Sequence, residues 1–211
     1  MQTGTRILVA DDHGIVRMGL VQVIKQLRPF AILTEVEDYK ALSSLISSES
    51  FDLVILDVNM PNGTLQQAID FIRIKQPELK ILIFSSQDEN LYALRYLKMG
   101  ANGFLNKLSS KEQIDEALSA MLQKGRFISD EIKDNMVSNS INNQQSASPL
   151  EALSNRELEV ANKLVQGLTL KELSNQLNLH TSTVSTYKNR VFEKLNITSI
   201  PELVAILRMY A

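Results

Sequence analysis

Five polar side chains that could take part in phosphate or metal chemistry follow short apolar runs in the first 124 residues. Asp11 and Asp12 follow one run, Asp57 a second, Ser85 a third and Lys107 a fourth. If these runs are parallel strands of one sheet, their carboxyl ends meet at one edge. The spacing therefore predicts a cluster of three carboxylates with a lysine and a hydroxyl beside it.

Such a cluster suits phosphoryl transfer to a carboxylate. Three neighbouring carboxylates repel one another unless a hard cation lies between them, and Mg²⁺ prefers oxygen ligands. A carboxylate in this setting can attack a phosphoryl donor to form an acyl phosphate. A lysine and a hydroxyl would then neutralise and hydrogen-bond the added oxygens. For any one aspartate alone, a solvated turn at a strand end is an equally good interpretation.

The elements that must position these residues alternate along residues 1–124. The candidate strands are residues 7–10, 32–36, 53–56, 81–84 and 103–105, and the candidate helices are residues 14–27, 38–48, 64–75, 88–98 and 110–123. Ser109 stands three residues before Glu112, which is the spacing of a capping box at the start of the last helix. Short β-branched runs between amphipathic stretches predict an α/β fold with a doubly wound five-stranded parallel sheet.

The composition changes after Gly125. Residues 138–149 are rich in Asn, Gln and Ser and predict a flexible linker within residues 125–150, with a short helix around residues 129–137. Residues 151–211 predict a small all-α domain of four helices at 154–166, 170–177, 181–195 and 199–209. Three capping-box spacings support these helices, namely Ser154 with Glu157, Thr169 with Glu172, and Ser199 with Glu202.

The third of these helices carries a polar face. Val184, Val191 and Leu195 recur at helical spacing and predict the buried side. The opposite side carries hydroxyl, amide and cationic groups suited to base edges and phosphates, namely Ser185, Thr186, Lys188, Asn189 and Arg190. From composition alone, a solvated helix face is the simpler interpretation.

Two motifs in the first domain give it a family resemblance. With Asp57-Val58-Asn59-Met60-Pro61 and Gly103-Phe104-Leu105-Asn106-Lys107 in place, residues 5–124 resemble the flavodoxin-like receiver domain of two-component response regulators. The resemblance implies that Asp57 accepts the phosphoryl group, that Lys107 pairs with it, and that Ser85 and Phe104 form the switch.

The resemblance also implies a magnesium site. The expected ligands are Asp12, Asp57, the main-chain carbonyl of Asn59, and Asp11 through water. Asn59 and Gln87 fall at positions that tune the lifetime of the phosphoryl group in the family. Two departures are visible, since His13-Gly14 replaces the common His-Pro and Leu108 stands where an acidic residue or proline is commoner.

The second domain is also similar to a known module. Residues 151–208 resemble the LuxR-type helix-turn-helix, through Leu153–Val160, Gln166–Leu173, Thr183–Tyr187 and Lys194-Leu195. With the receiver, this combination resembles the NarL/FixJ subfamily. The implied DNA contacts are Thr183, Ser185, Thr186, Lys188, Asn189, Arg190 and Lys194.

The turn before the recognition helix departs from the pattern. Asn178 replaces a common Gly but tolerates positive φ. His180 replaces the usual capping Ser, which predicts that Thr181 or Ser182 takes over the cap.

The family implies a regulator, not an enzyme. A sensor histidine kinase is expected to phosphorylate Asp57, and the receiver is expected to catalyse only this transfer and its own hydrolysis. Domain release or dimerisation would then let a homodimer bind two half-sites of double-stranded DNA. Two alternatives stay open: an orphan regulator whose receiver dimerises or senses without phosphorylation, and a phosphatase or nucleotide-binding enzyme on the same fold. The chain has no G-x-G-x-x-G or G-x-x-x-x-G-K-[ST] motif, and Asn59 stands where many aspartate-based phosphatases have Asp.

Composition agrees with a cytoplasmic, non-membrane protein. The 211 residues contain no Cys, and no apolar run approaches the ~18 residues of a membrane span. The net charge of −2 divides unevenly: residues 1–124 hold 13 basic and 15 acidic residues, whereas 151–211 hold seven and six. A single helical domain with so small an excess of cations would bind DNA weakly, which predicts that binding needs a dimer.

Overall fold

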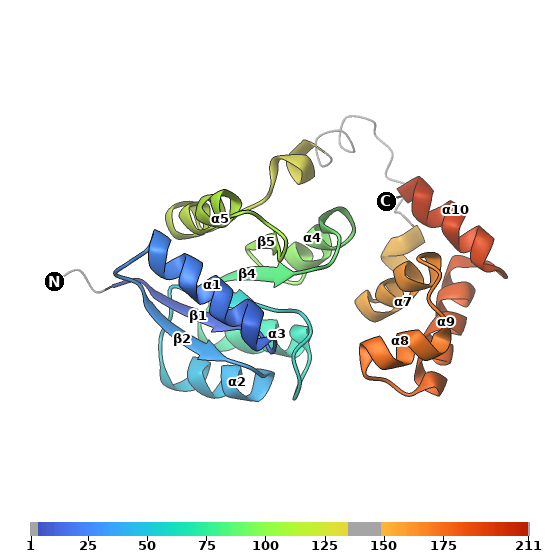
Figure 1. The fold of residues 1–211 in the computed structure, drawn as a ribbon, viewed down its shortest axis with the longest axis horizontal. Helices are drawn as coiled ribbons and strands as arrows, with labels where there is room; N and C mark the ends of the chain where they lie inside the picture. Colours follow the sequence, from blue (N-terminus) through green and yellow to red (C-terminus); the bar gives the residue numbers. More distant parts are fainter. Residues whose placement is uncertain (1–3, 135–148, 211) are drawn as a thin grey trace. The chain divides into compact units, whose positions relative to one another are not determined.

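The computed structural model describes residues 4–134 and 149–210 (Figure 1). The chain divides between Met136 and Val137 into two compact units, one α/β and one all-helical. Among the described residues, no helix is both long enough and apolar enough to cross a membrane.

The first unit is built on a five-stranded sheet in which all paired strands are parallel, as predicted. Its strands are β1 (Arg6–Ala10), β2 (Ile32–Val36), β3 (Leu53–Leu56), β4 (Lys80–Ser85) and β5 (Gly103–Asn106). Their order is β2-β1-β3-β4-β5, so the order reverses at β1. Ala10 pairs in register with Leu56, and the residues that follow these two therefore leave the sheet at the same level.

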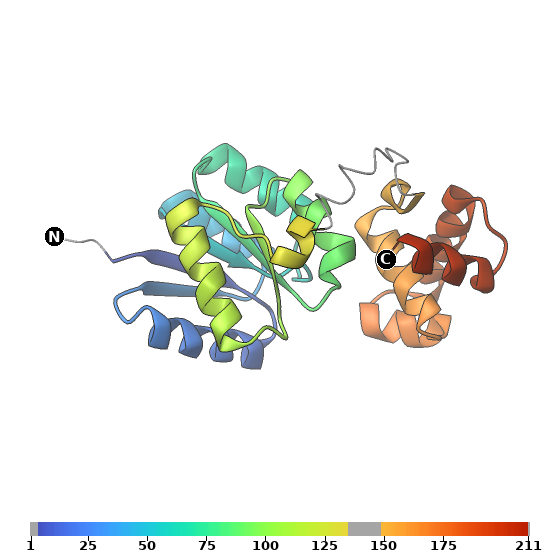
Figure 2. The same ribbon diagram turned by 90° about the horizontal axis from the view of Figure 1, so that it is seen from above.

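Helices cover both faces of the sheet (Figure 2). One layer holds α1 (Gly14–Leu27) and α5 (Lys111–Lys124), and the other holds α2 (Tyr39–Ser48), α3 (Leu65–Lys75) and α4 (Glu89–Lys98). Side chains from β1, β3 and β4 are almost wholly buried, because apolar helix faces pack on both sides of these strands. This double layer leaves the ends of the strands as the place for a polar site.

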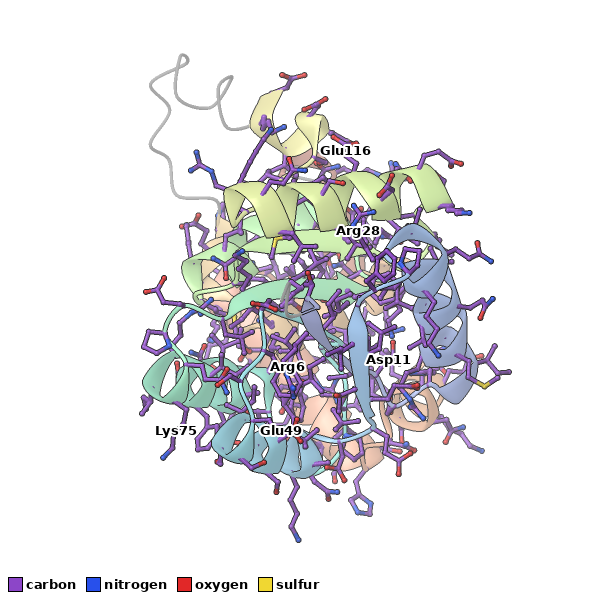
Figure 3. The ribbon with its side chains drawn as sticks, turned by 90° about the vertical axis from the view of Figure 1, so that its left-hand side faces the viewer. Arg6, Asp11, Arg28, Glu49, Lys75 and Glu116 are labelled. Carbon is purple, nitrogen blue, oxygen red and sulfur yellow. The ribbon has the colours of Figure 1, made fainter. Side chains whose placement is uncertain are left out.

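The amino ends of the strands are closed by ion pairs. Arg6 at the start of β1 pairs with Glu49, and its Nε donates to the carbonyl of Ser50 at 2.8 Å. Figure 3 shows Arg6 and Glu49 close together in this region. Arg28 links α1 to α5 through Asp115, with 2.8 Å between Nη1 and Oδ1. These contacts lie away from the carboxyl ends of the strands, where the predicted site residues are found.

Helix α5 starts one residue later than predicted. Ser110 caps it, accepting from the Gln113 amide at 3.3 Å while the Gln113 side chain accepts from the Ser110 amide at 2.8 Å. The expected pair of Ser109 and Glu112 was wrong, because Ser110 and Gln113, each one residue further along, have the same spacing and form the capping box instead.

The structured part of the first unit continues beyond residue 124. The Phe127 amide donates to the Asn102 carbonyl at 3.0 Å, and Phe127 forms a parallel bridge with Gly103 at the edge of β5. A Cβ on Gly103 would lie 2.7 Å from the Phe127 carbonyl oxygen, so this close approach requires glycine. Residues 130–134 are helical, and Ile132 is buried. We call residues 126–134 the strap; most of the predicted linker tract lies outside the described residues.

The second unit is a small helical domain. It contains the short 3₁₀ helix η1 (Pro149–Ala152) and the helices α7 (Asn155–Val165), α8 (Leu170–Leu177), α9 (Thr181–Leu195) and α10 (Ile200–Tyr210). The predicted capping boxes of Ser154 with Glu157 and of Thr169 with Glu172 are both present. The predicted helices are confirmed to within two residues at each end, while η1 was not expected.

Two residues with positive φ shape the turns around α8. Gly167 has φ 88° and ends α7 in a Schellman motif, because the Leu168 amide donates to the Lys163 carbonyl at 3.2 Å. Asn178 adopts the left-handed region at φ 51°, as the sequence predicted. The predicted transfer of the cap to Thr181 or Ser182 was wrong: His180 is the N-cap residue, without a side-chain cap bond. Its backbone is extended, and its carbonyl accepts the first bonds of the helix, from the amides of Thr183 at 2.9 Å and Val184 at 3.1 Å.

Candidate functional site

An acidic pocket lies where β1 and β3 end. The Asp57 amide donates to the Ala10 carbonyl at 2.8 Å, which ties the two strand ends together and brings Asp57 beside Asp11. Both side chains are buried, at 1% exposure for Asp11 and 3% for Asp57, whereas Asp12 is exposed. Asp11, labelled in Figure 3, follows directly from β1, which lies between β2 and β3 in the sheet.

Lys107 supplies positive charge to this pocket. Its amide donates to the Ser85 carbonyl at 2.8 Å, which directs the loop after β5 back toward β4. Its Nζ lies 2.8 Å from Oδ2 of Asp11 and 3.1 Å from Oδ2 of Asp57. The structure therefore brings together three of the predicted residues that the sequence separates by many tens of positions.

The two buried carboxylates remain short of hydrogen-bond donors. Oδ1 of Asp11 accepts from the His13 amide, and Oδ1 of Asp57 accepts from the Val58 amide, each at 2.8 Å. Neither Oδ2 accepts a well-aligned hydrogen bond, although the Lys107 ammonium lies within ion-pair distance of both. Two anionic oxygens facing one ammonium leave a negative excess that a cation can neutralise.

The donor set fits a divalent cation. One ligand atom from each of Asp11, Asp12, His13 and Asp57 can be chosen so that all lie within 4.8 Å of one another. Nδ1 of His13 lies 2.7 Å from Oδ1 of Asp12, and the His13 side chain is 62% exposed. Because three of these four groups are carboxylates, a hard cation with oxygen ligands suits the pocket better than a soft one.

Burial also changes the acidity of the pocket. It raises the pKa of the Asp57 carboxyl, the Lys107 charge lowers that pKa, and the Asp11 charge raises it again, with a net increase. The ionised form of Asp57 is therefore held in the folded protein against a desolvation penalty.

The predicted switch residues lie beside the pocket on β4 and β5. Ser85 is buried, and its Oγ accepts from the Gln87 amide at 3.2 Å. Phe104 is buried too, with its ring stacked on that of Tyr96 at a centroid distance of 6.2 Å. The Tyr96 hydroxyl donates to the Gln87 side chain, and this link was not predicted because Tyr96 reads in the sequence as a core position of α4.

The predicted DNA-contacting residues lie along α9. Thr186, Asn189 and Arg190 are exposed, whereas Thr183, Ser185 and Lys188 are half-buried. Nζ of Lys188 lies 5.3 Å from the ring centroid of Phe192 on the same helix.

Lys194 differs from these residues because an ion pair holds it within the domain. Its Nζ lies 2.7 Å from Oε2 of the buried Glu157. Burial alone would raise the pKa of the Glu157 carboxyl, but hydrogen bonds from Lys194 and Ser154 bring the pKa below its ordinary value. The capping-box spacing predicted Ser154 as the partner of Glu157 and did not reveal Lys194 as a second partner.

The α/β unit with its acidic pocket, joined to a small helical unit, defines a class of protein. The family model of the response regulator receiver domain matches residues 7–119, and that of bacterial regulatory proteins of the luxR family matches residues 151–207. The chain belongs to the two-component response regulators of the NarL/FixJ type, which are DNA-binding regulators of transcription.

Relatives match over nearly the whole chain. The Fimbriae Z protein of Escherichia coli K12 is 30% identical over 98% of this chain and 97% of its own length. Response regulator GacA of Pseudomonas aeruginosa is 30% identical over 95% and 94%. A structure of Salmonella typhimurium RcsB has a similar fold, with a TM-score of 0.58 at 24% identity over 99% of this chain and all of that one.

Replacing Asp57 by Asn is expected to raise the free energy of unfolding of the metal-free protein at pH 7. A carboxyl whose pKa is raised on folding favours the folded state only when protonated, so its ionisation at neutral pH lowers the free energy of unfolding. The difference should shrink as the pH falls toward the unfolded pKa of 3.8. Urea denaturation in a chelator measures it, with the exposed Asp70→Asn as control. A less stable Asp57→Asn protein at pH 7 would contradict the electrostatic assignment.

Proposed function

We propose that this regulator is switched by phosphorylation of Asp57 and binds DNA through α9 as a homodimer. The observation that carries this proposal is the convergence of Asp57, Asp11 and Lys107 in one buried pocket at the carboxyl ends of the strands. A carboxylate nucleophile with an adjacent ammonium and unsatisfied anionic oxygens is suited to accept a phosphoryl group.

In the proposed reaction, an oxygen of Asp57 attacks phosphorus, and the bond from phosphorus to the donor atom breaks with its electrons leaving on the donor. Lys107 neutralises charge on the phosphoryl oxygens, and the Ser85 hydroxyl donates to one of them. Asp11, Asp12 and Asp57, with the Asn59 carbonyl, would hold Mg²⁺, which supplies electrostatic stabilisation of the developing charge when bound. The receiver is proposed to turn over no other substrate.

A protein donor such as a sensor histidine kinase fits the surroundings of the pocket. Ile15 and Met18 on α1 are 88% and 69% exposed, and Leu108, next to Lys107, is 89% exposed. Ile15 and Met18 come shortly after the acidic pair Asp11 and Asp12 in the sequence, and Leu108 comes directly after Lys107. Exposed apolar groups of this size favour contact with another protein surface.

The strap offers a route from the pocket toward the second unit. Ser85 and Gln87 immediately precede α4, whose first residue, Glu89, hydrogen-bonds Ser129 of the strap. Nδ2 of Asn90 donates to Oε1 of Glu131 at 2.8 Å. We propose that a shift of the loop before α4 on phosphorylation loosens the strap, which is the described part of the first unit nearest in sequence to the second unit.

The DNA partner is proposed from the polar face of α9. Its exposed Asn189 and Arg190 suit base edges and phosphates. Relatives in fold have been solved as an RcsB–DNA complex and as two RcsB dimers on two parallel DNAs, with TM-scores of 0.58. A bacterial regulator of this kind would act in the cytoplasm, on promoter half-sites.

Incubation with acetyl phosphate and Mg²⁺ is expected to add one phosphoryl group to the protein and to raise its DNA affinity about tenfold. Intact-mass spectrometry and fluorescence anisotropy measure the two effects. Asp57→Ala should abolish both, while Asp70→Ala, which removes an exposed carboxylate on α3, should retain both. An unlabelled wild type, or labelling that persists in Asp57→Ala, would refute the assignment of Asp57.

Lys188→Ala is expected to weaken binding to all DNA sequences and to reduce the slope of log affinity against log salt by about 1, because one phosphate contact is lost. The matched control is Lys163→Ala on α7, where Nζ donates to Gln176 at 2.9 Å. Binding titrations at several salt concentrations measure the slopes. Equal slopes for wild type and Lys188→Ala would remove this lysine from the phosphate contacts.

Phosphorylation is expected to accelerate hydrogen–deuterium exchange in the strap, because its attachment to α4 loosens. Asn90→Ala should produce part of the same acceleration without phosphorylation, since it removes the contact with Glu131. Ser44→Ala on α2, at a hydroxyl bonded only locally to the Lys40 carbonyl, serves as the control. Unchanged exchange in the strap together with increased DNA affinity would show that the signal takes another route.

A further inference from the structure

The first residue of α2 holds the loop that follows the phosphoryl-accepting aspartate. Tyr39 is 4% exposed, and its hydroxyl lies 2.9 Å from the Val58 carbonyl oxygen and 3.3 Å from that of Asp57. In an extended strand, successive carbonyls point in opposite directions. One hydroxyl shared between both oxygens therefore marks the point where the chain bends out of β3.

Further contacts attach the same loop to the start of α2. The Tyr39 amide donates to the Pro61 carbonyl at 3.1 Å, and Nδ2 of Asn62 donates to Oδ2 of Asp38 at 3.0 Å. A Cβ on Gly63 would lie 2.8 Å from Cβ of Tyr39, so the backbone runs directly against the tyrosine. The loop from Asp57 to Gly63 is thus attached at several points to Asp38 and Tyr39, at the start of α2.

The phenol is well suited to act as a permanent donor here. Burial and the nearby Asp57 charge both raise the pKa of Tyr39 far above its ordinary value, so the hydroxyl keeps its proton. Without that hydroxyl, two carbonyls at the bend would lose a buried donor. The residue after this bend is Asn59, whose main-chain carbonyl is a proposed cation ligand.

We propose that Tyr39 is a positioning residue for the phosphorylation site. Its hydroxyl fixes the peptide groups of Asp57 and Val58, and through them the direction of the Asp57 carboxylate and the Asn59 carbonyl. The proposal rests on the proposed function of Asp57 and adds a residue that does not touch the reacting atoms.

Tyr39→Phe separates this role from simple packing. The ring that packs against Gly63 stays, while the hydrogen bonds to the Asp57 and Val58 carbonyls are removed. Tyr92→Phe is the matched control, because Tyr92 is equally buried but its ring stacks on Tyr96 on α4. Equal melting temperatures of the two variants would show that differences between them at the site are local.

The first measurement is Mg²⁺ binding to the unphosphorylated full chain by isothermal titration calorimetry. Tyr39→Phe is expected to weaken Mg²⁺ binding by about three- to tenfold, which corresponds to the net effect of one hydrogen bond. Exchange of the amides of residues 58–60 and 62 should also quicken in the absence of Mg²⁺. In both measurements Tyr92→Phe should match wild type.

The second measurement is the rate of labelling by acetyl phosphate at saturating Mg²⁺. A residual decrease in Tyr39→Phe at saturation would show that the carboxylate itself is misdirected, beyond the loss of cation affinity. If Tyr39→Phe does not fold, Gly63→Ala, which pushes the ring away from the loop, is the second variant and should weaken Mg²⁺ binding in the same direction.

The outcomes distinguish this inference from the proposed function. A wild type that neither binds Mg²⁺ nor accepts a phosphoryl group would refute the proposed function. A wild type that does both, with Mg²⁺ affinity, loop exchange and labelling rate unchanged in Tyr39→Phe, would refute only the role of Tyr39.

Discussion

The repulsion between two buried carboxylates is the constraint on which the first unit depends. Asp11 and Asp57 leave adjacent strands at the same level, and a single ammonium, that of Lys107, lies between them. Replacing either aspartate by an apolar residue would remove this repulsion. With both aspartates present, added cationic charge in the pocket stabilises the fold, so that ligand binding and folding are linked.

The rest of the first unit keeps the strand ends that carry Asp11 and Asp57 in place. The central strands are buried on both faces, so the strand ends can shift little relative to one another. The loops after β1, β3 and β5 are each tied by main-chain hydrogen bonds to a neighbouring strand or helix. On the side of the pocket that leads to α4, side chains take part in the contacts: Oγ of Ser85 accepts from the Gln87 amide at 3.2 Å, and Nδ2 of Asn106 donates to the Gln87 carbonyl at 3.1 Å.

The sequence predicts the fold well because its signals are local and periodic. The β-branched runs, the amphipathic helices and the capping spacings each need only a few neighbouring residues. The convergence of Asp11, Asp57 and Lys107 was also predictable, because parallel strands place their carboxyl ends at one edge. The attachments of Tyr39 to the loop after β3, and of Lys194 to Glu157, were not predictable from local patterns. They join residues 19 and 37 positions apart whose side chains also have an ordinary local interpretation.

The near-neutral net charge of the chain is the sum of an acidic first domain and a slightly basic second domain. A receiver that collects carboxylates around the proposed phosphorylation site becomes acidic, whereas the proposed DNA contacts of α9 require cations. Lys194 reduces the cations available for that purpose, because Glu157 binds its ammonium within the domain. Lys188 and Arg190 then remain as the basic residues of α9 outside that ion pair. In the proposed homodimer, two recognition helices double the number of cations that face DNA, so that control of dimerisation would be control of DNA binding.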